Sequence, residues 1–205
     1  MKSGVTILNH DTGFRNMKKE LVKRYGKEST ECIWQKAGTN LEELNARYVN
    51  LPKKVKLHTE GNMFRNAALY MAIKAEYPND AMEILEQGAK VEGLRIAKLF
   101  TKLSKIPGVK SMVLPVFSKM LDSFFGEEAG FKSIGYCSTK KEVRFDIIQC
   151  PYCKYLTEIG CPELVHISCD IDEYIYGNFP GFVFKRTGTI GTGLDKCDFC
   201  LKKAE

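Results

Sequence analysis

Long apolar runs are missing from this chain of 205 residues, in which uninterrupted apolar stretches span only a few positions. A membrane-crossing helix needs about 20 predominantly apolar residues in succession, so none is expected. Residues 1–12 are polar where a secretory signal would place its apolar core. These absences predict an unsecreted, cytoplasmic protein without a membrane partner.

Internal repeats, low-complexity stretches and an aromatic RNA-binding signature are also absent. The formal net charge is +6, and residues 1–130 carry the excess, with 21 Lys and Arg against 15 Asp and Glu. The basic residues between Lys18 and Lys27 could contact a phosphate backbone, but they fit better as the solvated face of an amphipathic helix. We therefore expect no nucleic-acid partner.

The chain is long enough, with 44% apolar residues, to bury a substantial core. We treat residues 1–205 as a single α+β domain, of which residues 1–126 are mostly helical. Apolar residues at helical spacing, with caps and breakers at the ends, predict the helices. They cover 11–26, a short stretch before Pro52, 63–77, a long stretch from Ala81 that ends before Pro107, and about 110–125.

Residues 131–201 form the predicted sheet region, because apolar residues there recur at every second position. A polar turn at 138–141 joins strands over 131–134 and 142–147, and a glycine-rich segment at 188–193 joins 182–186 to 197–201. Two short helices, 151–159 and 162–176, begin with proline and lie between these pairs. The predicted fold is a helical N-terminal half packed on a C-terminal antiparallel sheet with short intervening helices.

Cysteine is concentrated in this second region, since seven of the eight lie between Cys137 and Cys200. Cysteines of a cytoplasmic protein bind metal, act in catalysis or are simply buried. Two Cys-x-x-Cys pairs are typical of structural zinc, and the ligands would be Cys150, Cys153, Cys197 and Cys200. Glycine follows neither pair, however, and strand alternation would place Cys197 and Cys200 on opposite faces. Zinc is therefore an alternative, and the first expectation is no cofactor.

Cys-Pro-Tyr-Cys at 150–153 is also the active-site sequence of glutaredoxins. At a helix N-terminus the dipole would lower the pKa of Cys150. A thioredoxin-type domain needs this motif near its beginning, with a cis-proline loop opposite the thiols. Only 52 residues follow Cys153, and neither Pro162 nor Pro180 is placed for that loop. The redox interpretation is not favoured.

A third interpretation treats the cysteines singly. On a helix over 162–176, one face would carry His166, Cys169, Asp170 and Glu173, with Asp172 three residues beyond Cys169. A histidine stabilises a nearby thiolate, and clustered carboxylates raise one another's pKa, as acid–base catalysis requires. The structural alternative is that Cys169 is a small buried residue and the acids are a solvated face.

Two arginines are candidates for holding a substrate carboxylate, which the planar guanidinium binds in a fork. Arg144 and Asp146 share the face of their strand opposite Val143, Phe145 and Ile147, so they could equally form a cross-strand ion pair. Arg186 on a later strand offers the same choice.

Taken together, several segments resemble the L-2-amino-thiazoline-4-carboxylic acid hydrolase family in their order and spacing. They are Arg144–Tyr152, Gly160–Leu164, Cys169–Asp172, Phe184–Thr189, Gly193 and Cys197–Phe199. The resemblance is specific from Val143 onward, and Cys153 and Cys200 lie outside its pattern.

The resemblance implies a hydrolase of small cyclic amidines, which would act on C–N bonds other than peptide bonds. Water would attack the carbon between the ring sulfur and nitrogen of a small-molecule substrate and yield a carbamoylated cysteine. The positions carried over from the family are Cys150, Cys169, Asp172, Arg186, Gly193, Cys197 and Phe199.

Such chemistry needs an attacking group, a stabiliser for charge on the ring nitrogen and an anchor for the substrate. We predict Cys169 as nucleophile or as the thiol beside a bound water, and Asp172 as proton shuttle. Arg186 or Arg144 would anchor the substrate carboxylate.

Cys150 and Cys197 would complete the catalytic pocket or pack beneath it. The competing hypothesis is a non-catalytic module that binds zinc or a small molecule on the two Cys-x-x-Cys pairs, because a shared scaffold does not ensure a shared activity.

Overall fold

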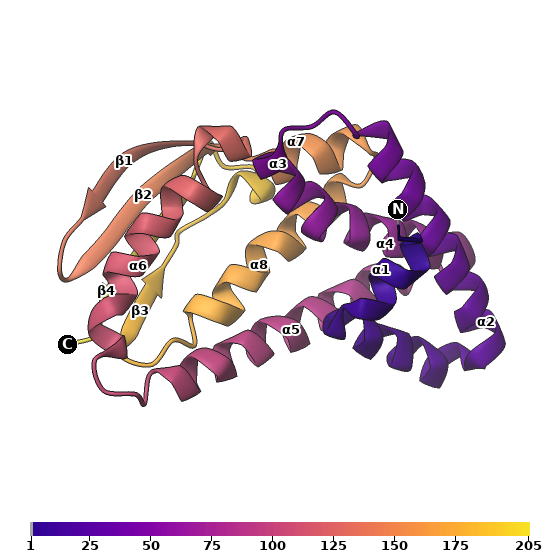
Figure 1. The fold of residues 1–205 in the computed structure, drawn as a ribbon, viewed down its shortest axis with the longest axis horizontal. Coiled ribbons are helices and arrows are strands. Elements are labelled where there is room, and N and C mark those ends of the chain that lie inside the picture. Colours follow the sequence, from indigo (N-terminus) through magenta and orange to yellow (C-terminus); the bar gives the residue numbers. More distant parts are fainter. Residues whose placement is uncertain (1) are drawn as a thin grey trace.

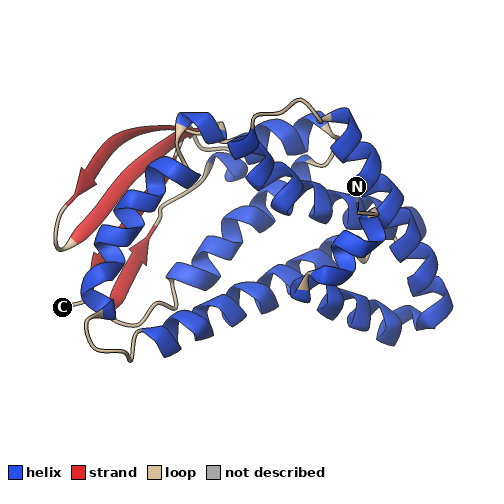
Figure 2. Cartoon of the chain, in the orientation of Figure 1, coloured by secondary structure: helices blue, strands red, loops and turns tan. Residues whose placement is uncertain are grey.

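The α+β class predicted from the sequence is confirmed by a computed structural model that describes residues 2–205 (Figures 1 and 2). The α-helices are α1 (Gly4–His10), α2 (Thr12–Arg47), α3 (Lys53–His58), α4 (Phe64–Glu76), α5 (Ala81–Leu103), α6 (Val109–Phe124), α7 (Pro151–Glu158) and α8 (Val165–Tyr176). The strands are β1 (Lys132–Ser138), β2 (Glu142–Gln149), β3 (Phe182–Lys185) and β4 (Cys197–Lys203). A π-helical turn (Thr59–Met63) precedes α4, and short 3-10 turns cover Glu127–Ala129, Pro162–Leu164 and Ile190–Thr192. No helix in this described part of the chain is long and apolar enough to cross a membrane.

Both predicted strand pairs are present, and β4 unites them into one four-stranded antiparallel sheet of order β1-β2-β4-β3. In this sheet Phe145 of β2 stands opposite Phe199 of β4, and their rings stack with centroids 5.0 Å apart. Alternate residues on both strands are buried, as the period of two predicted. One face of the two central strands is therefore apolar and covered.

Gly26 interrupts α2 with φ 79° and ψ 171°, a conformation that glycine alone adopts readily. The break predicted there is confirmed, but the chain resumes a helix at once and continues to Arg47. Thr30 donates its hydroxyl to the Gly26 carbonyl oxygen at 2.7 Å and so satisfies one backbone acceptor at the break. The short helix expected before Pro52 is the last part of this second stretch.

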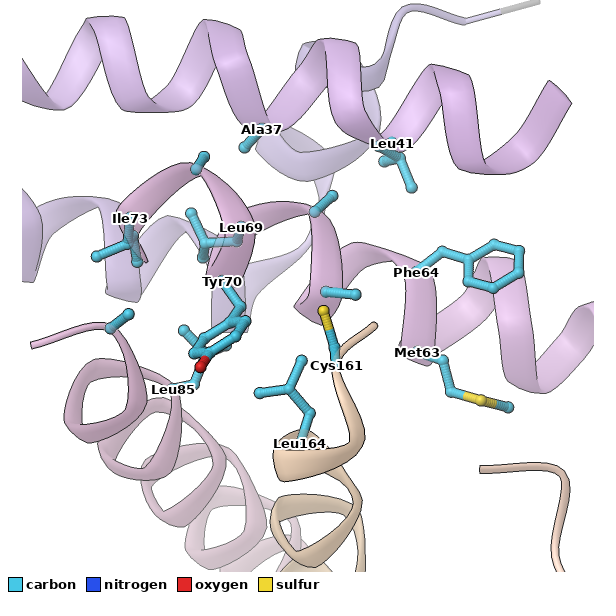
Figure 3. Packing of buried hydrophobic residues seen from close by; sticks show 14 of the residues in the cluster. Ala37, Leu41, Met63, Phe64, Leu69, Tyr70, Ile73, Leu85, Cys161 and Leu164 are labelled. Atoms are coloured by element: carbon cyan, nitrogen blue, oxygen red, sulfur yellow. The ribbon is translucent and has the colours of Figure 1, made fainter. Parts of the chain in front are cut away.

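Two apolar clusters form the interior. In the larger one, α2 and α4 pack against each other and against residues of α7, α8 and the segment between them. Figure 3 shows Leu69 and Tyr70 of α4 beside Cys161 and Leu164 of that connecting segment. In the smaller one, Leu114 and Leu121 of α6 lie against the apolar face of the sheet. The expected packing of the helical half on the sheet thus holds for α6, whereas the earlier helices pack on α7 and α8.

Tyr152, near the start of α7, joins the two clusters because its ring packs against members of both. It follows directly on β2, so the chain passes from one cluster to the other at this point. Cys150 and Cys153 flank Tyr152 at this junction.

Leu69 and Leu57 provide a matched test of this packing, since Leu69 is fully buried whereas Leu57 is 55% exposed. Leu69→Ala should lower the free energy of unfolding by about 2–5 kcal/mol, because it leaves a cavity in the larger cluster. Leu57→Ala should change it by less than about 0.5 kcal/mol. Urea denaturation measures both, and equal losses would contradict the assigned core.

Candidate functional site

Four thiols converge where β2 ends and β4 begins. Cys150 is the N-cap residue of α7, and Cys153 lies in the first turn of that helix. Cys169 comes from α8, and Cys197 opens β4. Burial raises the pKa of Cys169 and of Cys197, and the other thiols are close enough for their negative charge to add to the increase. We call Cys150, Cys153, Cys169 and Cys197 the thiol cluster.

Within the thiol cluster, Cys150 and Cys153 share a hydrogen bond that separates their acidities. The hydrogen bond and burial raise the pKa of Cys150, whereas the same hydrogen bond lowers the pKa of Cys153. The predicted position of Cys150 at a helix N-terminus is confirmed, but the lower pKa expected for it falls instead to Cys153. The less buried thiol of the pair ionises first because its partner donates to it.

Cys169 remains a neutral thiol near pH 7, because burial raises its pKa to about 11 despite an opposing hydrogen bond with Thr189. The loop beside it approaches closely at Gly191. A Cβ atom added there would lie 2.7 Å from Cγ1 of Val165 and 3.2 Å from Sγ of Cys169. Any larger residue at 191 would therefore push the loop away from the thiol.

Arg186, just after β3, is the charged centre of the site, with a side chain only 5% exposed. Its Nη1 lies 3.4 Å from Oδ2 of Asp172, and its Nη2 lies 3.2 Å from Oε1 of Glu173. Nη2 also donates to the carbonyl oxygen of Cys169 at 2.9 Å. The guanidinium thus ties the carboxylates of α8 and the backbone of Cys169 to the sheet.

Asp172 has the most perturbed carboxyl group of the site. Burial raises its pKa to about 7, although the Arg186 charge lowers it, and the charge of Glu173 adds to the increase. A carboxyl group with this pKa both gives and accepts protons near neutrality. It lies three residues, almost one helical turn, beyond Cys169 on α8.

Two tyrosines and a histidine extend the site beyond the residues expected from the sequence. Burial and the charge of Asp172 raise the pKa of both Tyr152 and Tyr176. The Tyr152 hydroxyl lies 3.3 Å from Nδ1 of His58, whose Nε2 lies 2.7 Å from the Phe124 carbonyl oxygen. A carbonyl only accepts, so Nε2 carries the hydrogen and Nδ1 accepts from Tyr152. Burial lowers the pKa of His58, which favours this neutral form.

The segment between β3 and β4 covers the thiol cluster and is held by Asp198. The carboxylate of Asp198 accepts hydrogen bonds from Thr187 and from the Gly188 backbone at 2.8–3.1 Å. Burial raises its pKa, but these donors outweigh that effect and keep the pKa of Asp198 below its ordinary value. Farther along, the Ile190 N–H donates to Sγ of Cys197 at 3.2 Å. The glycine-rich segment predicted as a strand connection is therefore part of the site.

Arg144, Cys200 and His166 do not join this group. Arg144 is 58% exposed, pairs with Glu142 and stands opposite Cys200 in the sheet register. Cys197 is buried and Cys200 is partly exposed, as the alternation of residues along the strand predicted. This arrangement argues against the zinc interpretation. His166 contacts Glu86 of α5 at 3.0 Å. Among the described side chains it forms no hydrogen bond with the Cys169 thiol, beside which it was expected.

The ligand set of the zinc alternative is therefore not brought together. Within residues 2–205, no three side chains of His, Cys, Asp or Glu are grouped so that they could hold a metal ion. Cys161, the remaining cysteine of the region, lies in the larger apolar cluster, and burial raises its pKa to about 11.

A sequence model of the L-2-amino-thiazoline-4-carboxylic acid hydrolase family matches residues 56–201. This chain belongs to that family. The matched range includes the whole thiol cluster, Asp172 and Arg186, together with the loop that covers them. Membership in the hydrolase family makes hydrolysis the expected class of reaction. No curated protein matches the chain.

Among solved structures, the chain is similar to H-NOX proteins. One from S. oneidensis, in the Fe(II)NO ligation state, has 10% identity and a TM-score of 0.38, with 100% of each chain covered. Another from K. algicida, Fe(II) unliganded, has 9% identity and a TM-score of 0.37, and covers 100% of this chain and 97% of its own. Similarity this weak supports no conclusion about this member of the hydrolase family.

The sequence held a signal for one of the residues it missed. Tyr152 lies inside the quoted family segment, between the two cysteines of the motif, but its hydroxyl meets His58 from 94 positions away. His58 belongs to α3, in a part of the chain where no motif was recognised. Only the packing of α3 and the end of α6 around α7 brings it to the site.

The acidity of Asp172 makes stability depend on pH. Because its pKa is raised from 3.8 to about 7 on folding, the folded state binds the proton more tightly than the unfolded chain. This contribution is complete below the unfolded pKa and is lost as the pH rises through the folded pKa. Relative to Asp172→Asn, the wild type should lose on the order of 2–4 kcal/mol of unfolding free energy between about pH 4 and pH 7.5.

Urea denaturation of both proteins across this pH range measures that difference. The asparagine variant is the control because it carries no titrating group at this position. If the unfolding free energy of the wild type, relative to that of Asp172→Asn, stayed constant or rose with pH, the raised pKa would be contradicted.

Proposed function

We propose that this protein opens the ring of a small cyclic amidine that carries a carboxylate, of the 2-amino-thiazoline-4-carboxylate type. The family membership supports the substrate class. The single observation that carries the proposal is the partly buried Asp172 carboxyl, which pairs with the Arg186 guanidinium at 3.4 Å and whose pKa of about 7 suits proton transfer.

The reaction adds water across the carbon–nitrogen double bond of the amidine. The oxygen of water bonds to the carbon, and one proton goes to the ring nitrogen. The carbon–sulfur bond then breaks, the sulfur takes the second proton, and a carbamoylated cysteine results. Each proton transfer is most efficient with a group whose pKa lies near the working pH, and we assign this role to Asp172.

Arg186 is the proposed anchor for the substrate carboxylate. Its guanidinium now pairs with Asp172 and with Glu173, whose side chain is 48% exposed and free to turn toward water. When Asp172 is protonated, the pair weakens and one edge of the guanidinium becomes available to a substrate anion. Binding of the carboxylate would thus favour the protonated, proton-donating form of Asp172.

Cys169 is assigned as the thiol beside the attacking water rather than as a thiolate nucleophile, because its pKa of about 11 keeps it protonated. Cys150 and Cys197 are also neutral thiols of the cluster, since their pKa values are raised as well. The proposed enzyme needs no cofactor for these steps.

Asp172→Asn tests the proton shuttle, and Asp170→Asn on the same helix is the matched control. Asp170 forms no ion pair among the described side chains. Loss of the shuttle should lower kcat at least about 100-fold, whereas Asp170→Asn should leave it nearly unchanged. Liquid chromatography with mass detection follows the product, which is one water heavier than the substrate. Full activity in Asp172→Asn would remove the proposed role.

The two arginines provide a second matched comparison. Arg186→Lys should raise KM about 10- to 100-fold, because lysine cannot reproduce the paired hydrogen bonds to a carboxylate. Arg144→Lys should leave KM unchanged, since that side chain is exposed beside Glu142. Initial rates over a range of substrate concentrations give both values. The opposite ranking would assign the anchor to Arg144.

Cys169→Ser distinguishes the two roles considered for this thiol. A serine hydroxyl still positions water, so the variant should keep kcat within about 10-fold of the wild type if no covalent step occurs. Intact-protein mass spectrometry during turnover should then show no substrate adduct. An adduct on the wild type that is absent from Cys169→Ser would make Cys169 the nucleophile.

A further inference from the structure

Figure 1 shows the turn that joins α5 to α6. An apolar groove runs between the C-terminal part of α5 and the length of α6, near this turn. Its volume is about 230 Å³. The walls consist of apolar and aromatic side chains, with Phe179 and Leu201 at the side of the sheet. The lining residues from the two helices are Phe100, Leu103, Val109, Met112, Val113, Val116, Phe117 and Met120.

The open side of the groove is formed by one stripe of α6. Met112, Val116 and Met120 recur at intervals of four residues and are 60%, 44% and 45% exposed. They line the groove and also face solvent, so the groove is accessible along its length. Exposed apolar side chains that are contiguous in this way mark a binding surface more often than isolated ones.

The surroundings of the groove are positively charged. Residues 93–121 contain six Lys and Arg and neither Asp nor Glu. Lys102, Lys105 and Lys110 are exposed around the turn between α5 and α6, and none of them forms an ion pair with a described carboxylate. The Lys110 ammonium lies 3.6 Å from the place of a Cβ on Gly181, two residues beyond Phe179 of the groove wall.

Size and charge together define the ligand. Pockets for drug-sized molecules usually measure about 300–1,000 Å³, so this groove suits a slender chain better than a ring system. Its apolar walls match hydrocarbon, and the lysines at its end match an anion. We propose that the groove binds a single-chain amphiphile with an anionic head, such as a medium- or long-chain carboxylate, with the chain along α6 and the head beside Lys110.

This site is separate from the proposed reaction site, although Tyr176 touches both regions. Tyr176 lines the groove and lies four residues beyond Asp172 on α8. The inference does not depend on the hydrolytic activity, so binding is tested without substrate.

Isothermal titration of the full chain with dispersed decanoate and dodecanoate, below their micelle-forming concentrations, tests the proposal directly. Affinity should rise about fourfold for each methylene added, as expected for hydrocarbon that leaves water. Dodecyltrimethylammonium, with the same chain and the opposite charge, should bind at least about 10-fold more weakly. Equal binding of the two would overturn the role of the lysines, and no binding of either would overturn the site.

Variants locate the ligand on the surface. Met112→Glu and Val116→Glu should each weaken dodecanoate binding at least about 10-fold, whereas Leu99→Glu, at a 51% exposed position outside the groove, should not. Lys110→Glu should weaken binding of the carboxylate, and Lys90→Glu on the same helical hairpin is its control. All substituted positions are exposed, and circular dichroism verifies that each variant folds.

A bilayer surface is the other occupant that the experiment must distinguish. Sedimentation with vesicles of phosphatidylcholine, with and without phosphatidylglycerol, measures membrane binding. Sedimentation with the anionic vesicles in the absence of dodecanoate binding would overturn the proposal and identify a membrane-docking face. Dodecanoate binding that is lost in Met112→Glu and retained in Leu99→Glu would support it.

Discussion

The arrangement of the site depends on the ion pairs and the hydrogen bond that the buried Arg186 guanidinium forms with α8. A charged group removed from water is costly unless it is paired and hydrogen-bonded. Here two carboxylates and one backbone carbonyl of α8 compensate for that cost, and the rings of Phe184 and Phe199 lie 5.6 and 5.4 Å from the guanidinium carbon. Because the partners belong to both α8 and the sheet, this one side chain determines how Cys169 and Asp172 face β4.

Burial also controls the protonation of the groups around Arg186. It raises the pKa of Asp172, Cys169 and Cys197, so most of these groups are neutral near pH 7. Cys153 is the exception, since the thiol of Cys150 donates to it. Cys153 lies outside the family pattern, yet in the folded protein it is the member of the thiol cluster with a lowered pKa.

Secondary structure was largely predictable, because it depends on local periodicity and on local breakers. The helices α4, α5 and α6 begin and end within a few residues of their expected positions, and both strand pairs have the expected partners. The pairing of β4 with β2 could not be predicted, since no turn connects these strands. The sequence could not predict whether Arg144 or Arg186 belongs to the site. Strand alternation shows which residues share a face of the sheet but not which face is covered.

The amino-acid sequence alone determined the α+β class, the family and the segment that carries the chemistry, since these follow from spacing along the chain. Tertiary structure alone decided which cysteines meet, that His166 contacts α5 rather than the Cys169 thiol, and that His58 reaches Tyr152 from a distant helix. It also decided the acidity of Asp172. The physical reason is that pKa values and side-chain contacts depend on burial and on neighbours far away in sequence, which no local pattern encodes.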